Sequence, residues 1–186
     1  MLLKTIFAGF GGQGVLMMGY SLAHAAMNAG FHTTYLPSYG AEVRGGTANC
    51  TVAISDEEIA SPVASAPDYL VILNMPSLYS FQNRIAAGGC IFLNSSIIEG
   101  RPSRKDVRVF EIPAGEIAER IGDPRTTNVV MLGAFLKQTA IVKPETYLQS
   151  LKEIMGGRKK GIMEVNRKAF SAGFDLFETS REESRT

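Results

Sequence analysis

Glycines near the start of the chain are spaced as in loops that bind anions. Gly9, Gly11 and Gly14 satisfy the pattern G-x-G-x-x-G. In this pattern the first glycine permits a tight turn, the second lets the backbone approach a phosphate, and the third allows a helix to pack closely on a strand. The unpaired amides that open the following helix carry its positive dipole end, which stabilises an anion. The binding residues that this loop predicts are Gly9, Phe10, Gly11, Gly12, Gln13 and Gly14.

The residues that flank the loop indicate what kind of ligand it holds. Residues 2–7 are an apolar run typical of a buried strand, and residues 15–23 are typical of a helix, so the motif has the context that it needs. A dinucleotide site also needs an acidic residue about 20 residues further on, to hold a ribose hydroxyl. The predicted second strand, residues 33–36, runs into Pro37 with no carboxylate at that place. The missing carboxylate counts against a dinucleotide, and a glycine turn with no ligand is the alternative to an anion site.

A second informative region, residues 38–46, combines three glycines with a tyrosine, an acid and a base between two predicted strands. Loops at strand ends in open α/β sheets are where ligands bind. The alternative is a solvent loop with a Glu42–Arg44 pair, which would contribute little to stability. The candidate binding residues of this region are Ser38, Tyr39, Gly40, Arg44, Gly45 and Gly46.

Length and composition predict a single globular domain. The chain has 186 residues, of which 45% are hydrophobic and 20% are charged, ordinary values for a soluble globular protein. Its net charge of +1 provides no broad basic field, so neither nucleic acid nor an anionic membrane is an expected partner. No signal-type segment is found at the N-terminus, and no apolar run approaches the roughly 18 residues that a membrane span needs. We therefore expect a cytoplasmic protein.

The two cysteines limit the redox chemistry of this chain. Cys50 and Cys90 are far apart and each lies in an apolar, strand-like run, so we expect buried free thiols instead of a disulfide. Two cysteines cannot build a four-thiolate iron–sulfur centre. No metal site is predicted, and any iron–sulfur cluster that this protein serves is expected on another chain.

Strand and helix signals alternate along the chain and predict an open, Rossmann-like α/β sheet with helices on both faces and a helical C-terminal part. The later predicted strands are residues 47–55, 69–74, 90–94 and 107–112. The predicted helices are residues 13–29, 75–87, 114–121, 143–155 and 162–174, with a longer helix that starts at residue 125. Residues 1–175 form one domain in this prediction and residues 176–186 a polar tail, of which residues 178–186 are expected to fray.

Particular residues of these elements carry further expectations. Gly133 is expected to allow a close contact between two helices. Asn74 and Ser95 follow the carboxyl ends of strands, where each could contact a ligand or cap the next helix. The expected packing face of the first helix consists of Leu16, Tyr20, Ala23 and Met27.

Four segments in this order resemble one protein family. They are the glycine loop with Gln13, residues 38–46, residues 125–133 and residues 166–173. Together they resemble the gamma subunit of a 2-oxoacid:ferredoxin oxidoreductase of the 2-oxoglutarate type, over residues 3–175. The resemblance implies a multi-subunit enzyme that decarboxylates a 2-oxoacid on thiamine diphosphate, transfers the acyl group to coenzyme A and passes electrons through iron–sulfur clusters to ferredoxin. The thiamine and cluster sites would belong mainly to the other subunits.

The resemblance also implies roles for single residues. The glycine loop would meet a phosphate of coenzyme A, with Asn128 among the binding residues. Arg44 is the best candidate for a charge-assisted bond to phosphate or to a substrate carboxylate, and Glu42 would orient it or a neighbouring subunit. An indolepyruvate-type subunit is a second hypothesis. A third is a free-standing nucleotide- or flavin-binding protein, which would be a stable monomer or homodimer.

Overall fold

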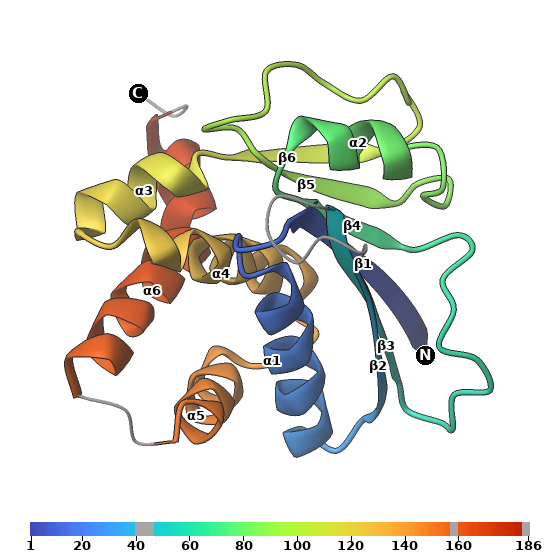
Figure 1. The fold of residues 1–186 in the computed structure, drawn as a ribbon, viewed down its shortest axis with the longest axis horizontal. Helices are drawn as coiled ribbons and strands as arrows, with labels where there is room; N and C mark the ends of the chain where they lie inside the picture. Colours follow the sequence, from blue (N-terminus) through green and yellow to red (C-terminus); the bar gives the residue numbers. More distant parts are fainter. Residues whose placement is uncertain (40–46, 157–159, 184–186) are drawn as a thin grey trace.

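The computed structural model describes residues 1–39, 47–156 and 160–183. In these residues six strands form one sheet in the order β2-β3-β1-β4-β5-β6, with helices against both of its faces (Figure 1). The strands are β1 (Leu2–Phe10), β2 (His32–Tyr39), β3 (Thr47–Ser55), β4 (Tyr69–Ile72), β5 (Cys90–Asn94) and β6 (Arg108–Ile112). The helices are α1 (Val15–Asn28), α2 (Met75–Phe81), α3 (Ala114–Ile121), the 3-10 turn η1 (Pro124–Thr126), α4 (Thr127–Thr139), α5 (Pro144–Ile154) and α6 (Lys160–Glu183). The predicted fold class is confirmed.

The chain adds strands first on one side of β1 and then on the other, so the strand order of the sheet reverses next to β1. β1, β4, β5 and β6 are parallel neighbours, whereas β3 is antiparallel to both β1 and β2. After β1 the chain passes through α1 to β2 on one side, and it later returns to β4 on the other side of β1. The carboxyl ends of β1 and β4 therefore form a topological switch point, the place where open α/β sheets bind ligands.

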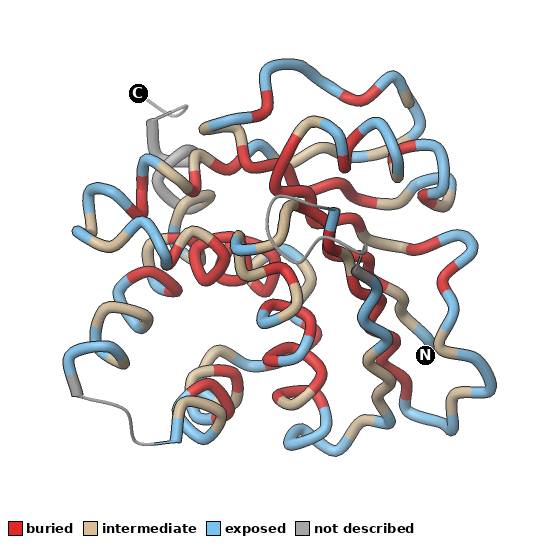
Figure 2. The backbone as a smooth tube through the Cα atoms, in the orientation of Figure 1, coloured by how far each residue is buried: buried red, intermediate tan, exposed pale blue. Residues whose placement is uncertain are grey.

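Alternating side chains divide the core between the two faces of the sheet. Phe7 of β1 belongs to the larger hydrophobic cluster, to which α1, α3, α4, α5 and α6 contribute. Ile6 and Ala8 belong to a smaller cluster that includes Leu78 of α2. Figure 2 shows that buried residues are concentrated in the central strands and in α1 and α4. Because β1 is covered on both faces, it has the continuous apolar sequence from which it was predicted.

The packing face of α1 differs from the predicted one. Tyr20 and Met27 are 45% and 53% exposed, and Leu16 is only partly buried, whereas Ala23 is buried as predicted. This helix contains no Asp, Glu, Lys or Arg and is apolar on more than one side, so helical spacing alone could not identify the face that the sheet covers. The buried residues of α1 are Val15, Met18, Gly19, Ser21, Leu22, Ala23, Ala25 and Ala26.

Several strand boundaries match the prediction, but the second strand is longer than predicted. Residues 47–55 and 90–94 are strands, as predicted. β2 was predicted to end at residue 36, whereas it continues through Pro37 and Ser38 to Tyr39. β2 is an edge strand that pairs with β3 alone, and an edge strand tolerates a proline because one row of its amides has no partner in the sheet.

Two helices also end elsewhere than predicted. α2 ends at Phe81, well before the predicted residue 87. α6 continues to Glu183, beyond the predicted end at residue 174. Just past that predicted end, the ring centroid of Phe177 lies 5.5 Å from that of Phe110.

α4 and α6 contact each other through their backbones at two glycines. A β-carbon at Gly133 would lie 2.8 Å from the amide nitrogen of Phe174, and a β-carbon at Gly173 would lie 2.8 Å from the carbonyl carbon of Val130. Such distances are shorter than packed carbon atoms tolerate. The predicted close contact at Gly133 is confirmed, and Gly173 is its counterpart on α6.

Candidate functional site

The glycine loop joins β1 to α1 at the carboxyl edge of the sheet. β1 ends at Phe10, and α1 begins at Val15 with Gly14 as its N-cap residue. The φ angles of Gly12 and Gly14 are 99° and 77°, values in the left-handed region that glycine adopts at little cost. Because Gly14 has no side chain, the described part of the chain gives α1 no side-chain cap, and within that part the amides of its first turn stay open to a ligand.

The loop leaves some backbone amides without protein partners. The Gln13 amide donates to the Phe10 carbonyl oxygen at 3.2 Å, and the Phe10 amide donates to the Gln13 Oε1 atom at 2.7 Å. Within residues 1–39, 47–156 and 160–183, the amides of Gly11, Gly12 and Gly14 donate to no other residue. Free amides beside a helix N-terminus attract negative charge. This loop can therefore donate hydrogen bonds to an anion.

Two of the loop glycines are also required by packing. A β-carbon at Gly9 would lie 2.8 Å from Val15 Cγ2 and 3.0 Å from Leu73 Cβ. Asn128, at the start of α4, is 8% exposed and donates from Nδ2 to the Gly14 carbonyl oxygen at 3.4 Å. A β-carbon at Gly14 would collide with the Asn128 side chain. The structure thus brings Asn128 to the loop, although 114 positions separate the two residues in the sequence.

Ser38 and Tyr39, the described residues of the second predicted region, lie at the same edge of the sheet as the glycine loop. Tyr39 of β2 and Gly9 of β1 both pair with Ala48 of β3, from opposite sides. Two strand spacings, roughly 10 Å, therefore separate these residues. Ser38 pairs with Asn49, the next residue along β3. The remaining predicted residues of this region, Gly40, Glu42, Arg44, Gly45 and Gly46, lie outside the described residues.

Asn74 and Ser95 both have structural roles at the carboxyl edge. Asn74 is the N-cap of α2, since its Oδ1 accepts a hydrogen bond from the Ser77 amide at 2.9 Å. Of the two alternatives for Asn74, the helix cap is therefore confirmed. The Ser95 amide donates to the Ile112 carbonyl oxygen at 2.8 Å and extends the pairing of β5 with β6.

Two cavities flank the glycine loop, and Gly12 lines both of them. The first, of about 560 Å³, lies at the start of α1 and is lined by Phe10, Gly11, Gly12, Gly14, Val15, Leu16, Met17 and Ala48. The second, of about 340 Å³, lies at the ends of β4 and β5 and is lined by Gly12, Gln13, Leu73, Asn94, Ile97, Gly115, Pro124, Arg125 and Thr127. The first lining is largely apolar, whereas the second contains a guanidinium and a buried amide. A ligand held at Gly12 can reach both cavities.

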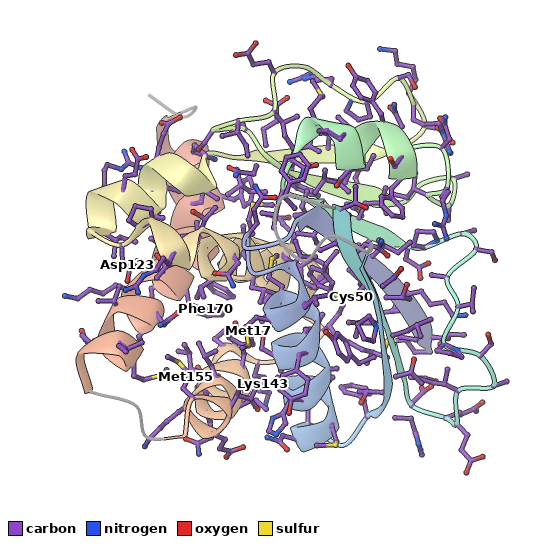
Figure 3. The ribbon with its side chains drawn as sticks, in the orientation of Figure 1. Met17, Cys50, Asp123, Lys143, Met155 and Phe170 are labelled. Carbon is purple, nitrogen blue, oxygen red and sulfur yellow. The ribbon has the colours of Figure 1, made fainter. Side chains whose placement is uncertain are left out.

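Arg125, on the rim of the second cavity, was not among the predicted site residues. Its Nε and Nη2 atoms lie 2.8 Å and 2.7 Å from the two carboxylate oxygens of Asp123 (Figure 3 labels Asp123). Hydrogen bonding to Arg125 lowers the pKa of Asp123, and the same bonds raise the pKa of Arg125. Arg125 belongs to one of the four segments that resemble the family, but only the folded chain places it near Gly12.

The two cysteines are buried and free, as predicted. Cys50 lies in the sheet beside α1 (Figure 3), where a β-carbon at Gly19 would collide with its sulfur. Burial raises the pKa of the Cys50 thiol to about 12. Only the thiolate is nucleophilic, so this thiol is inert in the folded chain.

Alkylation measures that inertness directly. At pH 8 the folded chain is expected to resist iodoacetamide at both Cys50 and Cys90, because both thiols are buried and Cys50 remains protonated. The chain in concentrated urea is the control, and both of its cysteines should react within minutes. Mass spectrometry counts the adducts, and rapid modification of Cys50 in the folded chain would contradict the prediction.

The described residues offer neither a membrane-spanning helix nor a cluster of metal-binding side chains. None of the helices in residues 1–39, 47–156 and 160–183 combines the length and the apolar character that crossing a bilayer requires. Three or more His, Cys, Asp or Glu side chains do not come together anywhere in the same residues in a way that could hold a metal ion.

Sequence comparison identifies relatives of this chain. A family model described as pyruvate ferredoxin/flavodoxin oxidoreductase matches residues 4–176. Ketoisovalerate oxidoreductase subunit VorA of Methanothermobacter thermautotrophicus is 42% identical over 171 residues, which are 91% of this chain and 35% of VorA. 2-Oxoglutarate synthase subunit KorC of the same organism is 35% identical over 176 residues, which are 91% of this chain and 92% of KorC. The chain therefore spans about a third of the length of VorA and nearly all of KorC.

Solved structures share the fold. The gamma subunit of a keto/oxoacid ferredoxin oxidoreductase from Geobacter sulfurreducens matches with a TM-score of 0.78 and 26% identity, over 93% of this chain and 96% of that one. A 2-oxoglutarate:ferredoxin oxidoreductase from Magnetococcus marinus, solved with 2-oxoglutarate, coenzyme A and succinyl-CoA bound, matches with a TM-score of 0.88. The second match covers 96% of this chain and 31% of that one, and its 23% identity bears on the fold alone. The match to the family model and the identity to KorC together show that the chain belongs to the pyruvate ferredoxin/flavodoxin oxidoreductase family.

Proposed function

We propose that this chain is the gamma subunit of a multi-subunit 2-oxoacid:ferredoxin oxidoreductase that converts 2-oxoglutarate or a related 2-oxoacid to its acyl-CoA. Membership of the family and the identity to KorC along nearly all of its length support this proposal. The subunit is inactive alone. Thiamine diphosphate and the iron–sulfur clusters belong to partner subunits, and electrons leave the complex on ferredoxin.

The part of this chain in the reaction is to hold coenzyme A. The observation that carries this assignment is the glycine loop, which lies at the switch point of the sheet and whose amides at Gly11, Gly12 and Gly14 have no partner among the described residues. These amides hold a phosphate of coenzyme A, and Asn128 stabilises the loop through its hydrogen bond to the Gly14 carbonyl oxygen. The largely apolar cavity beside α1 receives uncharged parts of the molecule. Coenzyme A supplies the thiol that accepts the acyl group.

The identity to VorA supports an alternative substrate for the assembled enzyme. The identity to VorA, whose name assigns it to a ketoisovalerate oxidoreductase, is 42%, compared with 35% for KorC. A branched 2-oxoacid is therefore the alternative to 2-oxoglutarate. Substrate choice resides in the subunit that binds thiamine diphosphate, so either substrate is compatible with the same coenzyme A loop.

Purification of the tagged chain from its native host tests the proposed function. The purified material is assayed for coenzyme A-dependent reduction of ferredoxin or a viologen dye with a panel of 2-oxoacids. Recovery of partner subunits with activity on 2-oxoglutarate is the expected result, and a preference for ketoisovalerate would select the alternative substrate. A preference for an arylpyruvate would identify an indolepyruvate-type enzyme. Recovery of the chain alone with a bound nucleotide would instead identify a free-standing nucleotide-binding protein.

Arg44 provides a test of the coenzyme A site at a single residue. Arg44→Ala is expected to raise the KM for coenzyme A of the assembled enzyme about tenfold to a hundredfold, because a hydrogen bond between charged groups contributes roughly 1.5–3 kcal/mol. Arg101→Ala is the control, since Arg101 is an exposed arginine that pairs with Glu111 and lines neither cavity at the loop. Unchanged KM and kcat for coenzyme A in the Arg44 variant would remove Arg44 from the site.

A further inference from the structure

The side chain of Gln13 makes three hydrogen bonds to other residues at the base of the glycine loop. Its Oε1 atom accepts hydrogen bonds from the Phe10 amide at 2.7 Å and from Asn74 Nδ2 at 3.2 Å. Its Nε2 atom donates to the Leu73 carbonyl oxygen at 3.4 Å. Gly9 makes room for this arrangement, because a β-carbon there would lie 2.7 Å from Oε1. The side-chain amide of Gln13 thus bridges the ends of β1 and β4, the two strands of the switch point.

Asn74 continues this bridge into α2. Its side chain is 3% exposed and uses both ends, since Oδ1 accepts from the Ser77 amide at 2.9 Å while Nδ2 donates to Gln13. The direction of each bond is fixed. Gln13 must present its oxygen to the Phe10 amide, so only a donor at residue 74 can face that oxygen. The glycine loop is therefore tied to a capped helix by a defined chain of hydrogen bonds.

We propose that Gln13 and Asn74 are positioning residues for coenzyme A. The inference rests on the proposed function. The bonds to Phe10 and Leu73 fix the base of the loop, and this keeps the amides of Gly11 and Gly12 directed at the ligand before it binds. A site that is already in its binding geometry loses less freedom when the ligand arrives, and so binds more tightly. Gln13 and Asn74 act through their bonds to protein and not by touching the ligand.

Substitutions at Asn74 separate the bridge from the helix cap. Asn74→Asp keeps an oxygen for the Ser77 amide, and aspartate is as good an N-cap as asparagine, but it places an acceptor opposite the Gln13 oxygen. Asn74→Ser also keeps a capping oxygen, but its shorter side chain has no amide that could reach the Gln13 oxygen. Gln13→Met preserves the length of the side chain and removes all three of its hydrogen bonds.

The control for general loss of stability is Gln82→Met. Gln82 is 7% exposed, and its Oε1 accepts from the Ser103 amide and hydroxyl at 2.8 Å and 3.2 Å, on a segment that lines neither cavity at the loop. The Gln82→Met variant therefore loses two side-chain hydrogen bonds at a position away from the loop. All variants are measured in the assembled enzyme, with separate KM values for coenzyme A and for the 2-oxoacid.

The expected result is a selective change in coenzyme A binding. Gln13→Met and Asn74→Asp should each raise the KM for coenzyme A about tenfold, and Asn74→Ser about threefold, while the KM for the 2-oxoacid stays within twofold and Gln82→Met changes neither. The double variant of Gln13→Met with Asn74→Asp should resemble the more severe single variant, because residues that act as one unit are not additive. Unchanged coenzyme A KM values, equal changes in both KM values, or additive effects would each overturn the proposal.

A charge placed on the loop separates this proposal from the proposed function. If Gly12→Asp weakens coenzyme A binding while the Gln13 and Asn74 variants do not, coenzyme A binds at the loop and the positioning role is wrong. If Gly12→Asp also leaves the KM for coenzyme A unchanged, the loop does not hold this ligand, and both proposals are overturned.

Discussion

Gly173→Ala is expected to destabilise the folded chain by about 3 kcal/mol, at the upper end of the range for overpacked sites. The added methyl group would lie 2.8 Å from the Val130 carbonyl carbon and still closer to the carbonyl oxygen of the same residue. A flexible side chain could move away, but these atoms belong to the backbone of α4, so α4 and α6 would have to separate along their contact. Urea unfolding, followed by circular dichroism, measures the loss.

Gly161→Ala is the matched control, because Gly161 lies in the same helix and, outside its own stretch of that helix, no described residue has an atom within 4 Å of a β-carbon built there. Alanine favours helix over glycine by about 1 kcal/mol, so this variant should be as stable as the parent or more stable. If Gly173→Ala were equally harmless, the close contact between α4 and α6 would not contribute to the stability of the chain.

Gly12→Asp is expected to raise the KM for coenzyme A about a hundredfold, whereas the uncharged Gly12→Asn should have a much smaller effect. Asp and Asn tolerate the positive φ of Gly12 better than most residues. Apart from its chain neighbours, no atom of the described residues lies within 4 Å of a β-carbon built at Gly12, so the two variants share any backbone strain. They differ in one negative charge. At about 5 Å from a phosphate, near a protein surface, that charge costs about 3 kcal/mol, which corresponds to about a hundredfold in binding.

Gly30 provides the control for this pair of variants. It follows the other end of α1 and has a φ of 92°, and in the part of the chain that the structure describes only its chain neighbours come within 4 Å of a built β-carbon. Gly30→Asp and Gly30→Asn should therefore have the same KM for coenzyme A. Steady-state kinetics of the assembled enzyme at several salt concentrations gives the comparison, because added salt should reduce the effect of the charge at Gly12. Equal KM values for Gly12→Asp and Gly12→Asn would exclude an anion at the loop.

The sequence predicts the elements of this fold better than their arrangement. The strand at residues 47–55 is rich in β-branched residues and was predicted at its observed bounds. Its insertion between β1 and β2, antiparallel to both, depends on pairings across the sheet such as Ala48 with Gly9. Local periodicity carries no information about those pairings, so the proximity of β2 to the glycine loop could be seen only in the folded chain.

The candidate site follows the same division. The glycine spacing predicted a loop between a strand and a helix, and the loop is there. The roles of the side chains around the loop follow only in part from the sequence, which favoured a helix cap over a ligand contact for Asn74 but gave no sign of its bond to Gln13. Its partners, Ser77 and Gln13, lie 3 and 61 positions away, and only the first is within reach of a local sequence argument.

The reversed strand β3 has a consequence for how this site can change. Tyr39 is paired with Ala48, so the sheet holds the two ends of the connection from β2 to β3 side by side. The entropic cost of closing a loop between fixed ends grows slowly with length, by about 0.6 kcal/mol for each doubling. Insertions or replacements between these ends therefore cost the sheet little, while its register stays fixed by the paired strands. The scaffold separates a part of this edge that must keep its geometry, the glycine loop, from an adjacent part whose length can change at little cost to the sheet.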